Sequence, residues 1–595
     1  MCGIIGEIQK SNQVNLDQFN TLRDFLFHRG PDGFGTEVLN EGTVALGHRR
    51  LSIIDLSENA KQPMCNEDSS IWITFNGEIY NFQELKSELS HHTFKSNSDT
   101  EVLVHGYEEW GIEKLLQKVK GMFAFGIFDS KKQQLLFARD RFGIKPFVYQ
   151  HTQNHFIFAS EIRCIAKRNS FNKNINQDAL ADYFTYSYVP YPLTIWEGVY
   201  KLPPAHYGIL DLGSFELRLS KYWDLPVADV LISDVEAVDK VHELIDNATR
   251  QHLISDVPIG LFLSGGYDST TLLIKMLDLG YKPNVFTIGF PGHENDETLQ
   301  AKAIANHFGV KHFVENIPAG INVVDLLREL SVYYDEPFAG NSMINNHLIA
   351  KTTVKHAKVA FSGEGADEVF GGYKWHRKIE SHYEQGTLKR LLKNCRAGIF
   401  DSKTEFLKLY NRSMLGVLEE NHYHNVVNPE LTQSMSIRSL WHFEEFYNLK
   451  ITDRVKRTQY IDAHTFIPNH CLQRADLSSM ANSLEVRVPF LDHEIYEYVF
   501  SLNRSVYMKK GSKKFLLEER LKNHIPDAVL NMPKKGFSFH FSKNNFQKEF
   551  DGILENGLIV KYGILNNKGL QKNQISDHFK FHLVNLEFWL QNHFE

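Results

Sequence analysis

Up to about residue 210, short apolar runs alternate with turn residues, which is the pattern of β-strands. Residues 71–75 form one run that ends in Asn76-Gly77, residues 122–128 form another that ends at Asp129, and residues 156–159 form a third. Strands with this spacing predict packed antiparallel sheets.

Beyond about residue 235, helical and strand patterns alternate. An apolar strand at 260–263 is followed by a glycine-rich loop, a helix at 269–279 and a second strand at 285–290. Strands that alternate with helices predict a parallel α/β sheet, and the C-terminal half that follows is helix-rich. Because the chain has no internal repeat or low-complexity linker, we expect two domains in tight contact, residues 2–212 and 213–595.

Composition narrows the class of protein. Apolar residues make up 42% of the chain and charged residues 23%, as in a globular protein with a substantial core. The net charge of −7 gives no basic footprint for nucleic acid or an anionic membrane. Five dispersed cysteines (Cys2, Cys65, Cys164, Cys395 and Cys471) form no CxxC pair, which indicates reduced thiols in a cytoplasmic protein. We expect neither a signal peptide nor a membrane span, because no apolar run approaches the roughly 18 residues that a span needs.

Cys2 is the first candidate for catalysis. Removal of Met1 would place its thiol beside a free α-amine with a pKa of about 7.7–8.0. That amine can serve as general base for the thiol, which is the arrangement of an N-terminal nucleophile. A cysteine at position 2 is usually incidental, so its surroundings decide the matter.

Hydrolysis of a glutamine amide through a thioester needs three kinds of group. A guanidinium holds the substrate carboxylate, carboxylates hold its ammonium, and amide donors stabilise the oxyanion. Arg50 can supply the first, Glu78 and Asp99 the second, and Asn76 with the Gly77 N–H the third.

Together these segments resemble the glutaminase domain of class II glutamine amidotransferases, an α+β N-terminal-nucleophile fold of antiparallel sheets sandwiched by helices. The matching segments are residues 2–6, 29–33, 47–55, 76–81, 98–101, 121–125, 139–146 and 159–162. The resemblance implies that Cys2 is the nucleophile and that Arg50, Asn76, Gly77, Glu78 and Asp99 bind glutamine or the oxyanion. Arg49 is the alternative to Arg50, but the spacing to Leu51 favours Arg50.

A second candidate site is the segment Leu263-Ser264-Gly265-Gly266-Tyr267-Asp268-Ser269, which ends a strand and opens a helix. Its glycines let backbone N–H groups approach a phosphate, and the helix N-terminus favours an anion. It lacks the GK[ST] ending of a Walker A loop. It resembles the pyrophosphate-binding loop of enzymes that adenylylate a carboxyl group, with Asp268 as a Mg²⁺ ligand and Ile288 beside the adenine.

Residues 361–368 form another glycine-rich turn, which carries Ser362, Gly363, Glu364 and Asp367. The acids of this turn could cap the next helix. Combined with the first loop, Ser362 and Gly363 are predicted to contact ATP, and Asp367 to share Mg²⁺ with Asp268. Glu364 is predicted to act as an acid–base or ammonia-handling residue.

The whole chain thus resembles the glutamine-hydrolysing asparagine synthetase family, including residues 479–492 and 533–537. The resemblance implies an α/β ATP-pyrophosphatase domain with a helical C-terminal part, glutamine, ATP and a carboxylate acceptor as substrates, Mg²⁺ as cofactor, and homodimers as in many relatives. Ammonia would pass from Cys2 to an acyl-adenylate through a dry internal tunnel, because ammonium in water cannot attack.

Three departures leave the acceptor open. Tyr267 replaces an aliphatic residue, Leu477 replaces a basic one, and residues 335–342 lack an aspartate near Gly340. Aspartate is the favoured acceptor, and a sugar uronic acid of a surface-polysaccharide pathway is the alternative. A third hypothesis, an inactive relative that serves as a binding module, conflicts with intact Cys2, Asp99, Asp268 and Asp367.

Overall fold

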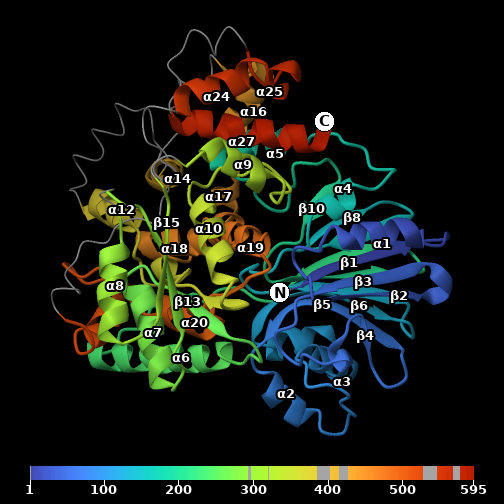
Figure 1. The fold of residues 1–595 in the computed structure, drawn as a ribbon, viewed down its shortest axis with the longest axis horizontal. Helices are drawn as coiled ribbons and strands as arrows, with labels where there is room; N and C mark the ends of the chain where they lie inside the picture. Colours follow the sequence, from blue (N-terminus) through green and yellow to red (C-terminus); the bar gives the residue numbers. More distant parts are fainter. Residues whose placement is uncertain are drawn as a thin grey trace.

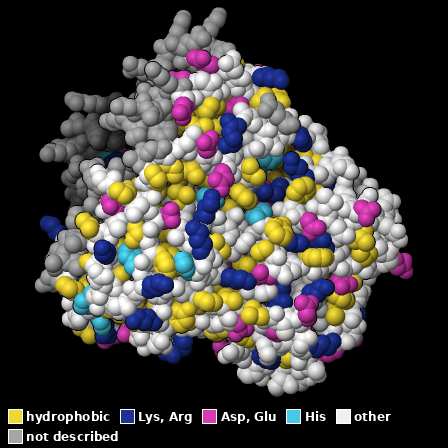
Figure 2. All heavy atoms as spheres, viewed as in Figure 1, with side chains coloured by type: hydrophobic (Ala, Val, Ile, Leu, Met, Phe, Trp, Pro, Cys, Tyr) yellow, Lys and Arg dark blue, Asp and Glu magenta, His cyan; other side chains and the backbone are white. Residues whose placement is uncertain are grey.

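The structure is a computed structural model that describes residues 2–292, 296–318, 321–384, 402–414, 426–526, 546–566 and 577–594. Met1, Cys395 and the motif at 533–537 lie outside these residues. None of the helices described is long and apolar enough to cross a membrane. On the face shown in Figure 2, basic and acidic side chains are interspersed.

The N-terminal part of the chain, up to residue 221, contains two six-stranded sheets in which all strand pairs are antiparallel. The first sheet has the order β10-β8-β9-β1-β3-β2, formed by β1 (Gly3–Gln9), β2 (Gly33–Leu39), β3 (Val44–Arg50), β8 (Val148–His151), β9 (His155–Ala159) and β10 (Val199–Lys201). The second has the order β12-β11-β7-β6-β5-β4, formed by β4 (Met64–Cys65), β5 (Ile71–Ile79), β6 (Gly121–Asp129), β7 (Gln134–Arg139), β11 (His206–Asp211) and β12 (Leu217–Lys221). The strand β12 lies beyond residue 212, where the sequence places the domain boundary; that boundary stays a prediction.

The two sheets face each other across an apolar cluster that includes Ile4, Phe128 and Phe158. Helix α1 (Leu16–Asp24) packs on β3, and α3 (Thr100–Lys118) packs on β5 beside α2 (Phe82–Glu88), so helices cover the outer faces (Figure 1). Strand β6 is covered on both faces and is therefore buried along nearly its whole length. This burial explains why its sequence is a continuous apolar run. The predicted antiparallel sheets sandwiched by helices are confirmed.

Strand β5 differs from the sequence prediction at its end. It continues through Asn76-Gly77 to Ile79 instead of ending there. A Cβ atom on Gly77 would lie 2.1 Å from the Met122 carbonyl oxygen of β6. Glycine is therefore needed for close approach of the two strands, and Asn76-Gly77 is not a turn.

The C-terminal part, from residue 234, contains a parallel five-stranded sheet, as predicted, with the order β15-β14-β13-β16-β17. Its strands are β13 (Ile259–Phe262), β14 (Asn284–Gly289), β15 (His312–Asn316), β16 (Val359–Phe361) and β17 (Glu485–Arg487). The chain leaves β13 toward β14 on one side and later returns to β16 on the other side. Such a reversal opens a crevice at the carboxyl ends of the two central strands, and the glycine-rich loops follow β13 and β16.

Helices surround this sheet and form most of the remaining chain, in agreement with the predicted helical C-terminal part. Those that pack on its strands are α7 (Tyr267–Asp278), α8 (Thr298–His307), α10 (Met343–Thr353) and α19 (Gln473–Met480), while α6 (Asp234–His252) packs on α7 and α11 (Ala366–Val369) directly follows the loop after β16. The other described helices are α4 (Arg163–Ala166), α5 (Gln177–Tyr186), α9 (Val323–Ser331), α12 (Lys374–Glu384), α14 (Ser402–Met414), α16 (Pro429–Arg438), α17 (Trp441–Glu445), α18 (Arg454–His464), α20 (His493–Ser501), α21 (Arg504–Tyr507), α22 (Phe515–Leu521), α24 (Phe546–Glu555), α25 (Leu558–Lys561) and α27 (Asp577–Phe594).

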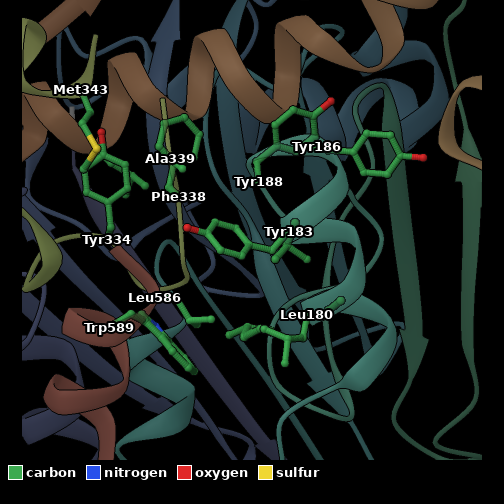
Figure 3. Packing of buried hydrophobic residues seen from close by; sticks show 14 of the residues in the cluster. Leu180, Tyr183, Tyr186, Tyr188, Tyr334, Phe338, Ala339, Met343, Leu586 and Trp589 are labelled. Carbon is green, nitrogen blue, oxygen red and sulfur yellow. The ribbon is translucent and has the colours of Figure 1, made fainter. Parts of the chain in front are cut away.

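A buried apolar cluster joins the two parts of the chain. Helix α5 packs against α16, and the Tyr183 hydroxyl donates a hydrogen bond to the His582 carbonyl at 2.7 Å. Figure 3 shows the α5 residues Leu180 and Tyr183 on one side of this cluster and Trp589 of α27 on another. Because this cluster is buried and contains residues of both parts, separating them would expose apolar surface to water.

Trp589→Ala is expected to lower the free energy of unfolding by about 3–5 kcal/mol. The Trp589 side chain is 1% exposed, and its indole N–H donates to the Asp335 carbonyl at 2.9 Å. The shift of the urea unfolding midpoint measures this loss. Trp110→Ala, on the half-buried face of α3, is the control and should cost about 1 kcal/mol; equal shifts for the two variants would contradict the assignment of Trp589 to the joint.

Candidate active site

Cys2 and Asn76 meet where the two N-terminal sheets face each other. The Cys2 backbone nitrogen, just before β1, donates a hydrogen bond to Asn76 Oδ1 on β5 at 2.9 Å. The Cys2 Sγ lies 3.9 Å from the Leu51 carbonyl oxygen. The Asn76 side chain is fully buried, and its Nδ2 has no hydrogen-bond partner among the described residues. The site thus holds a thiol beside a buried amide donor that is free to bind an oxyanion.

Burial raises the pKa of the Cys2 thiol, and the nearby Arg50 guanidinium opposes that rise. The thiol is therefore protonated at neutral pH. Since the thiolate is the nucleophile, a base must remove this proton when a substrate is attacked.

The structure distinguishes the two neighbouring arginines of β3. Alternate residues of a strand face opposite sides, and Arg49 turns away to donate to the Gly30 carbonyl at 3.2 Å and to pair with Asp24 at 3.3 Å. Arg50 donates to the carbonyls of Asp55 and of Ser57, the latter at 2.9 Å, and lies near enough to Cys2 to affect its charge. This geometry favours Arg50, as the sequence predicts, for holding a substrate carboxylate.

Three buried carboxylates, Glu78, Asp99 and Glu485, lie close enough together for the charge of Glu485 to act on the other two, and that charge also acts on the Cys2 thiol. Asp99 accepts a hydrogen bond from the Ile79 N–H at 2.8 Å, and burial raises its pKa to about 6. Burial, and then the negative charge of Glu485, raise the pKa of Glu78 as well. The Arg487 guanidinium pairs with Glu485 at 2.6 Å and with Glu78 at 3.2 Å.

Glu485 and Arg487 come from β17 of the C-terminal sheet, and the sequence analysis gave neither of them a role. Both are 0% exposed. The available signal was two opposite charges at alternate positions of an apolar run, since residues two apart in a strand share a face. Carboxylates buried together favour binding of a cation such as an ammonium group.

The loop after β13 has the form of a phosphate cradle. The Ser264 N–H donates to Ser269 Oγ at 3.2 Å, and the Gly266 N–H donates to Ser264 Oγ at 3.3 Å. Gly265 has a φ of +80°, and a Cβ there would lie 2.7 Å from Gln300 Cβ. Glycine is thus required, and the loop leads directly into α7. Leu263 and Ile288 are buried in and beside the strands that precede the crevice.

The loop after β16 touches the first loop. A Cβ on Gly363 would lie 2.9 Å from Asp268 Cβ, so glycine permits the contact. Glu364 pairs with the buried Arg474 at 2.6 Å, and the Ser362 N–H donates to the Arg487 carbonyl at 2.9 Å. Strand β17 therefore contacts both candidate sites: the Arg487 side chain pairs with Glu78 of the predicted glutamine site, and the Arg487 backbone carbonyl holds the nucleotide loop.

Asp268 and Asp367, predicted to bind Mg²⁺, converge on one cation. Lys514 Nζ lies 2.5 Å from an Asp268 oxygen and 2.8 Å from an Asp367 oxygen, and the lysine side chain is 3% exposed. Two converging carboxylates beside a phosphate cradle fit magnesium, which favours few carboxylates plus phosphate oxygens. The sequence analysis missed Lys514, because one lysine of a Lys-Lys pair in a polar loop carries no distinguishing pattern.

Arg29 connects the thiol site to the C-terminal part. Its guanidinium, 0% exposed, donates to the Cys2 carbonyl at 3.2 Å and pairs with Glu161 at 3.0 Å and Asp476 at 2.9 Å. Leu51, next to the thiol, belongs to the same apolar cluster as Phe361 at the nucleotide loop.

Two of the sequence departures have a structural setting. Asp335 pairs with Arg163 at 2.8 Å, and Glu336 pairs with Lys201, so this segment ties the two parts together. Tyr267 opens α7, where the Lys513 ammonium lies 5.6 Å from its ring centroid. Nothing in the structure explains Leu477, which is buried in α19.

Comparison with known proteins agrees with this two-site arrangement. Residues 1–223 match the family model of the glutamine amidotransferase domain, and residues 240–578 match the asparagine synthase family model. Asparagine synthetase (glutamine-hydrolyzing) 1 of Bacillus subtilis is 32% identical, over 93% of this chain and 90% of its own length. Asparagine synthetase (glutamine-hydrolyzing) 3 of the same organism is 31% identical, over 90% of this chain and 87% of its own. Amidase chry2 of Gibberella zeae is 30% identical, over 88% of this chain and 85% of its own.

The chain therefore belongs to the asparagine synthase family, the carbon–nitrogen ligases in which a glutamine amidotransferase domain precedes the synthetase domain.

Proposed function

We propose that the protein converts aspartate, glutamine, ATP and water to asparagine, glutamate, AMP and pyrophosphate. The observation that carries this proposal is the double role of β17, in which Arg487 faces the thiol pocket and also holds Ser362 of the nucleotide loop. Because a glutaminase site and an adenylylating site share one strand, ammonia released at the first can be used at the second.

The N-terminal site would hydrolyse glutamine. The Cys2 α-amine, oriented by Asn76 Oδ1, takes the thiol proton as Sγ attacks the amide carbon. The oxyanion accepts hydrogen bonds from Asn76 Nδ2 and the Gly77 N–H. Collapse expels ammonia with that proton and leaves a thioester, and water then releases glutamate and the thiol. Arg50 would hold the substrate carboxylate, and Glu78 and Asp99 its ammonium.

The C-terminal site would activate the acceptor. Its carboxylate attacks the α-phosphorus of ATP, pyrophosphate leaves from the cradle of Ser264, Gly265, Gly266 and Ser269, and an acyl-adenylate remains. Magnesium held by Asp268 and Asp367 would neutralise phosphate charge. Ammonia then attacks the acyl carbon and AMP leaves, while Glu364, held by Arg474, takes the proton.

The route for ammonia would follow the apolar cluster that runs from Leu51 beside the thiol to Phe361 at the nucleotide loop. An apolar lining keeps ammonia unprotonated and therefore nucleophilic. A relative that is 30% identical over 88% of this chain is named an amidase, so the acceptor assay should include carboxylates other than aspartate.

Assays of the two half-reactions with separate variants test the function. Cys2→Ala should reduce glutamine-dependent asparagine formation by at least about a hundredfold, because the nucleophile is lost, yet change ammonium-dependent formation by no more than about twofold. Asp268→Asn should do the reverse, with glutaminase activity kept and pyrophosphate release lost. If aspartate elicits no pyrophosphate release while another carboxylate does, the acceptor assignment is wrong and the two-site chemistry stands.

Glutamine affinity should depend on pH through Asp99. Because burial raises its pKa to about 6, Asp99 is ionised above that pH and holds the glutamine ammonium, and protonation below it removes the attraction. In Cys2→Ala protein, the Kd for glutamine measured by calorimetry should rise as pH falls from 7 to 5, approaching about tenfold per pH unit below 6. Asp99→Asn should bind glutamine more weakly throughout and lose the rise in Kd that the parent shows around pH 6, while any dependence that remains belongs to Glu78, whose pKa is also raised. A flat profile for the parent protein would contradict the role of Asp99.

Lys514→Gln should lower the synthetase rate by at least about a hundredfold, because the cation between Asp268 and Asp367 is removed. Glutaminase activity should stay unchanged. Lys513→Gln, at the exposed neighbouring position, is the matched control. If both variants lose the same fraction of the synthetase rate, positive charge near the crevice is sufficient and the position of Lys514 is not specifically required.

A further inference from the structure

A cluster of histidines and glutamates lies in the N-terminal part, apart from both sites above. Glu67 follows β4, His92 follows α2, and His105 and Glu108 lie on α3. The last two are three residues apart and so share a helix face. One ligand atom from each of the four lies within 4.8 Å of those of the others. Figure 1 shows α2, α3 and β4 together at the lower edge of the N-terminal part.

His105 is the observation that points to a ligand. Its side chain is 1% exposed, yet neither ring nitrogen has a hydrogen-bond partner within the described residues. Its Nδ1 lies 3.6 Å from a Glu67 oxygen, and its Nε2 lies 3.6 Å from a Glu101 oxygen. His92 Nε2 is likewise buried without a hydrogen bond, and its Nδ1 lies 3.5 Å from Glu67. Buried polar atoms left unpaired are costly, so the cluster is built for a further occupant.

The surroundings of His105 fix its orientation. Glu101 accepts hydrogen bonds from the Lys95 N–H at 2.8 Å and from the Ser96 N–H at 2.8 Å. This fixed anion favours the tautomer with a proton on Nε2 of His105. The Nδ1 lone pair then faces Glu67, where a cation is needed between them.

The carboxylates of the cluster are also held in place. Glu67 accepts a hydrogen bond from the Thr93 N–H at 3.0 Å. Glu108 accepts one from Asn66 Nδ2 at 3.1 Å. Partners of this kind around a histidine and its carboxylates orient the ligands of protein metal sites, and the partly exposed Glu67 leaves a path for an ion.

We propose that Glu67, His92, His105 and Glu108 form a Zn²⁺ site. Two imidazole nitrogens and two carboxylate oxygens make a four-ligand set that suits zinc. Imidazole ligands argue against magnesium and calcium, which favour all-oxygen sites. The ion would fasten the loops that carry Glu67 and His92 to α3. That helix begins directly after Asp99, so the site would stabilise one wall of the glutamine pocket.

The test is zinc binding by the full chain in excess Mg²⁺, on a Cys2→Ala background that removes the thiol at the N-terminus. Apo protein should take up one equivalent of Zn²⁺, measured by titration and by metal analysis after dialysis, and its thermal unfolding midpoint should rise. Glu67→Gln and His105→Gln should each weaken binding by at least about tenfold. Since His105 is buried and its variant can misfold, the partly exposed Glu67→Gln is the decisive one.

Glu109→Gln and His91→Ala are the matched controls. They alter an adjacent, exposed ion pair of 3.2 Å on the same surface and should leave Zn²⁺ affinity within about twofold of the parent. The proposal is overturned if the protein takes up less than one equivalent, or if Glu67→Gln binds like the parent. Loss of binding in the control variants would instead place the ion at His91, His92 and Glu109. If the protein binds no metal at these residues, the zinc proposal fails, and the charges of Glu67 and Glu101 on either side of His105 are what the cluster provides for.

Discussion

The guanidinium of Arg487 is the interaction on which the two-site arrangement depends. It lies on β17 of the C-terminal sheet and is 0% exposed, yet it pairs with Glu78 of the N-terminal sheets. Its partner Glu485 is equally buried. A buried ion pair that loses one partner leaves an uncompensated charge, at a cost of about 3–5 kcal/mol. The thiol pocket is therefore completed only when the C-terminal sheet is docked against it.

This dependence explains the geometry of the nucleotide crevice. The carboxyl ends of β13 and β16 meet at the point where the strand order reverses, which places both glycine-rich loops side by side. The next strand outward is β17, so its backbone holds the Ser362 loop while its alternate side chains reach the thiol pocket. A three-residue strand thereby fixes the distance between two chemistries that must exchange ammonia.

Local patterns were sufficient for the strands, the parallel sheet and the two loops, because each is specified by residues close in sequence. Cys2, Asn76 and Arg50 lie together as predicted, although their roles stay predictions. The pairing of Arg487 with Glu78, and of Lys514 with Asp268 and Asp367, joins residues more than a hundred positions apart in the sequence. No local periodicity encodes such contacts. The prediction of a turn at Asn76-Gly77 was wrong for a related reason. The glycine is required by the close approach of the Met122 backbone on the neighbouring strand, which the local sequence does not reveal.

The same long-range contacts bear on how ammonia transfer is coupled to synthesis. Arg29 pairs with Asp476 of the C-terminal part and donates to the carbonyl of Cys2 itself, and it is 0% exposed. Separation of the two parts would remove Asp476, one of the two carboxylate partners of this guanidinium, and would expose the apolar cluster that contains Leu51 and Phe361. Both costs oppose a large domain motion during turnover. Glutamine hydrolysis and synthesis are therefore better coupled by small rearrangements of the substrate loops across a fixed joint. Opening the joint would admit water, which protonates ammonia.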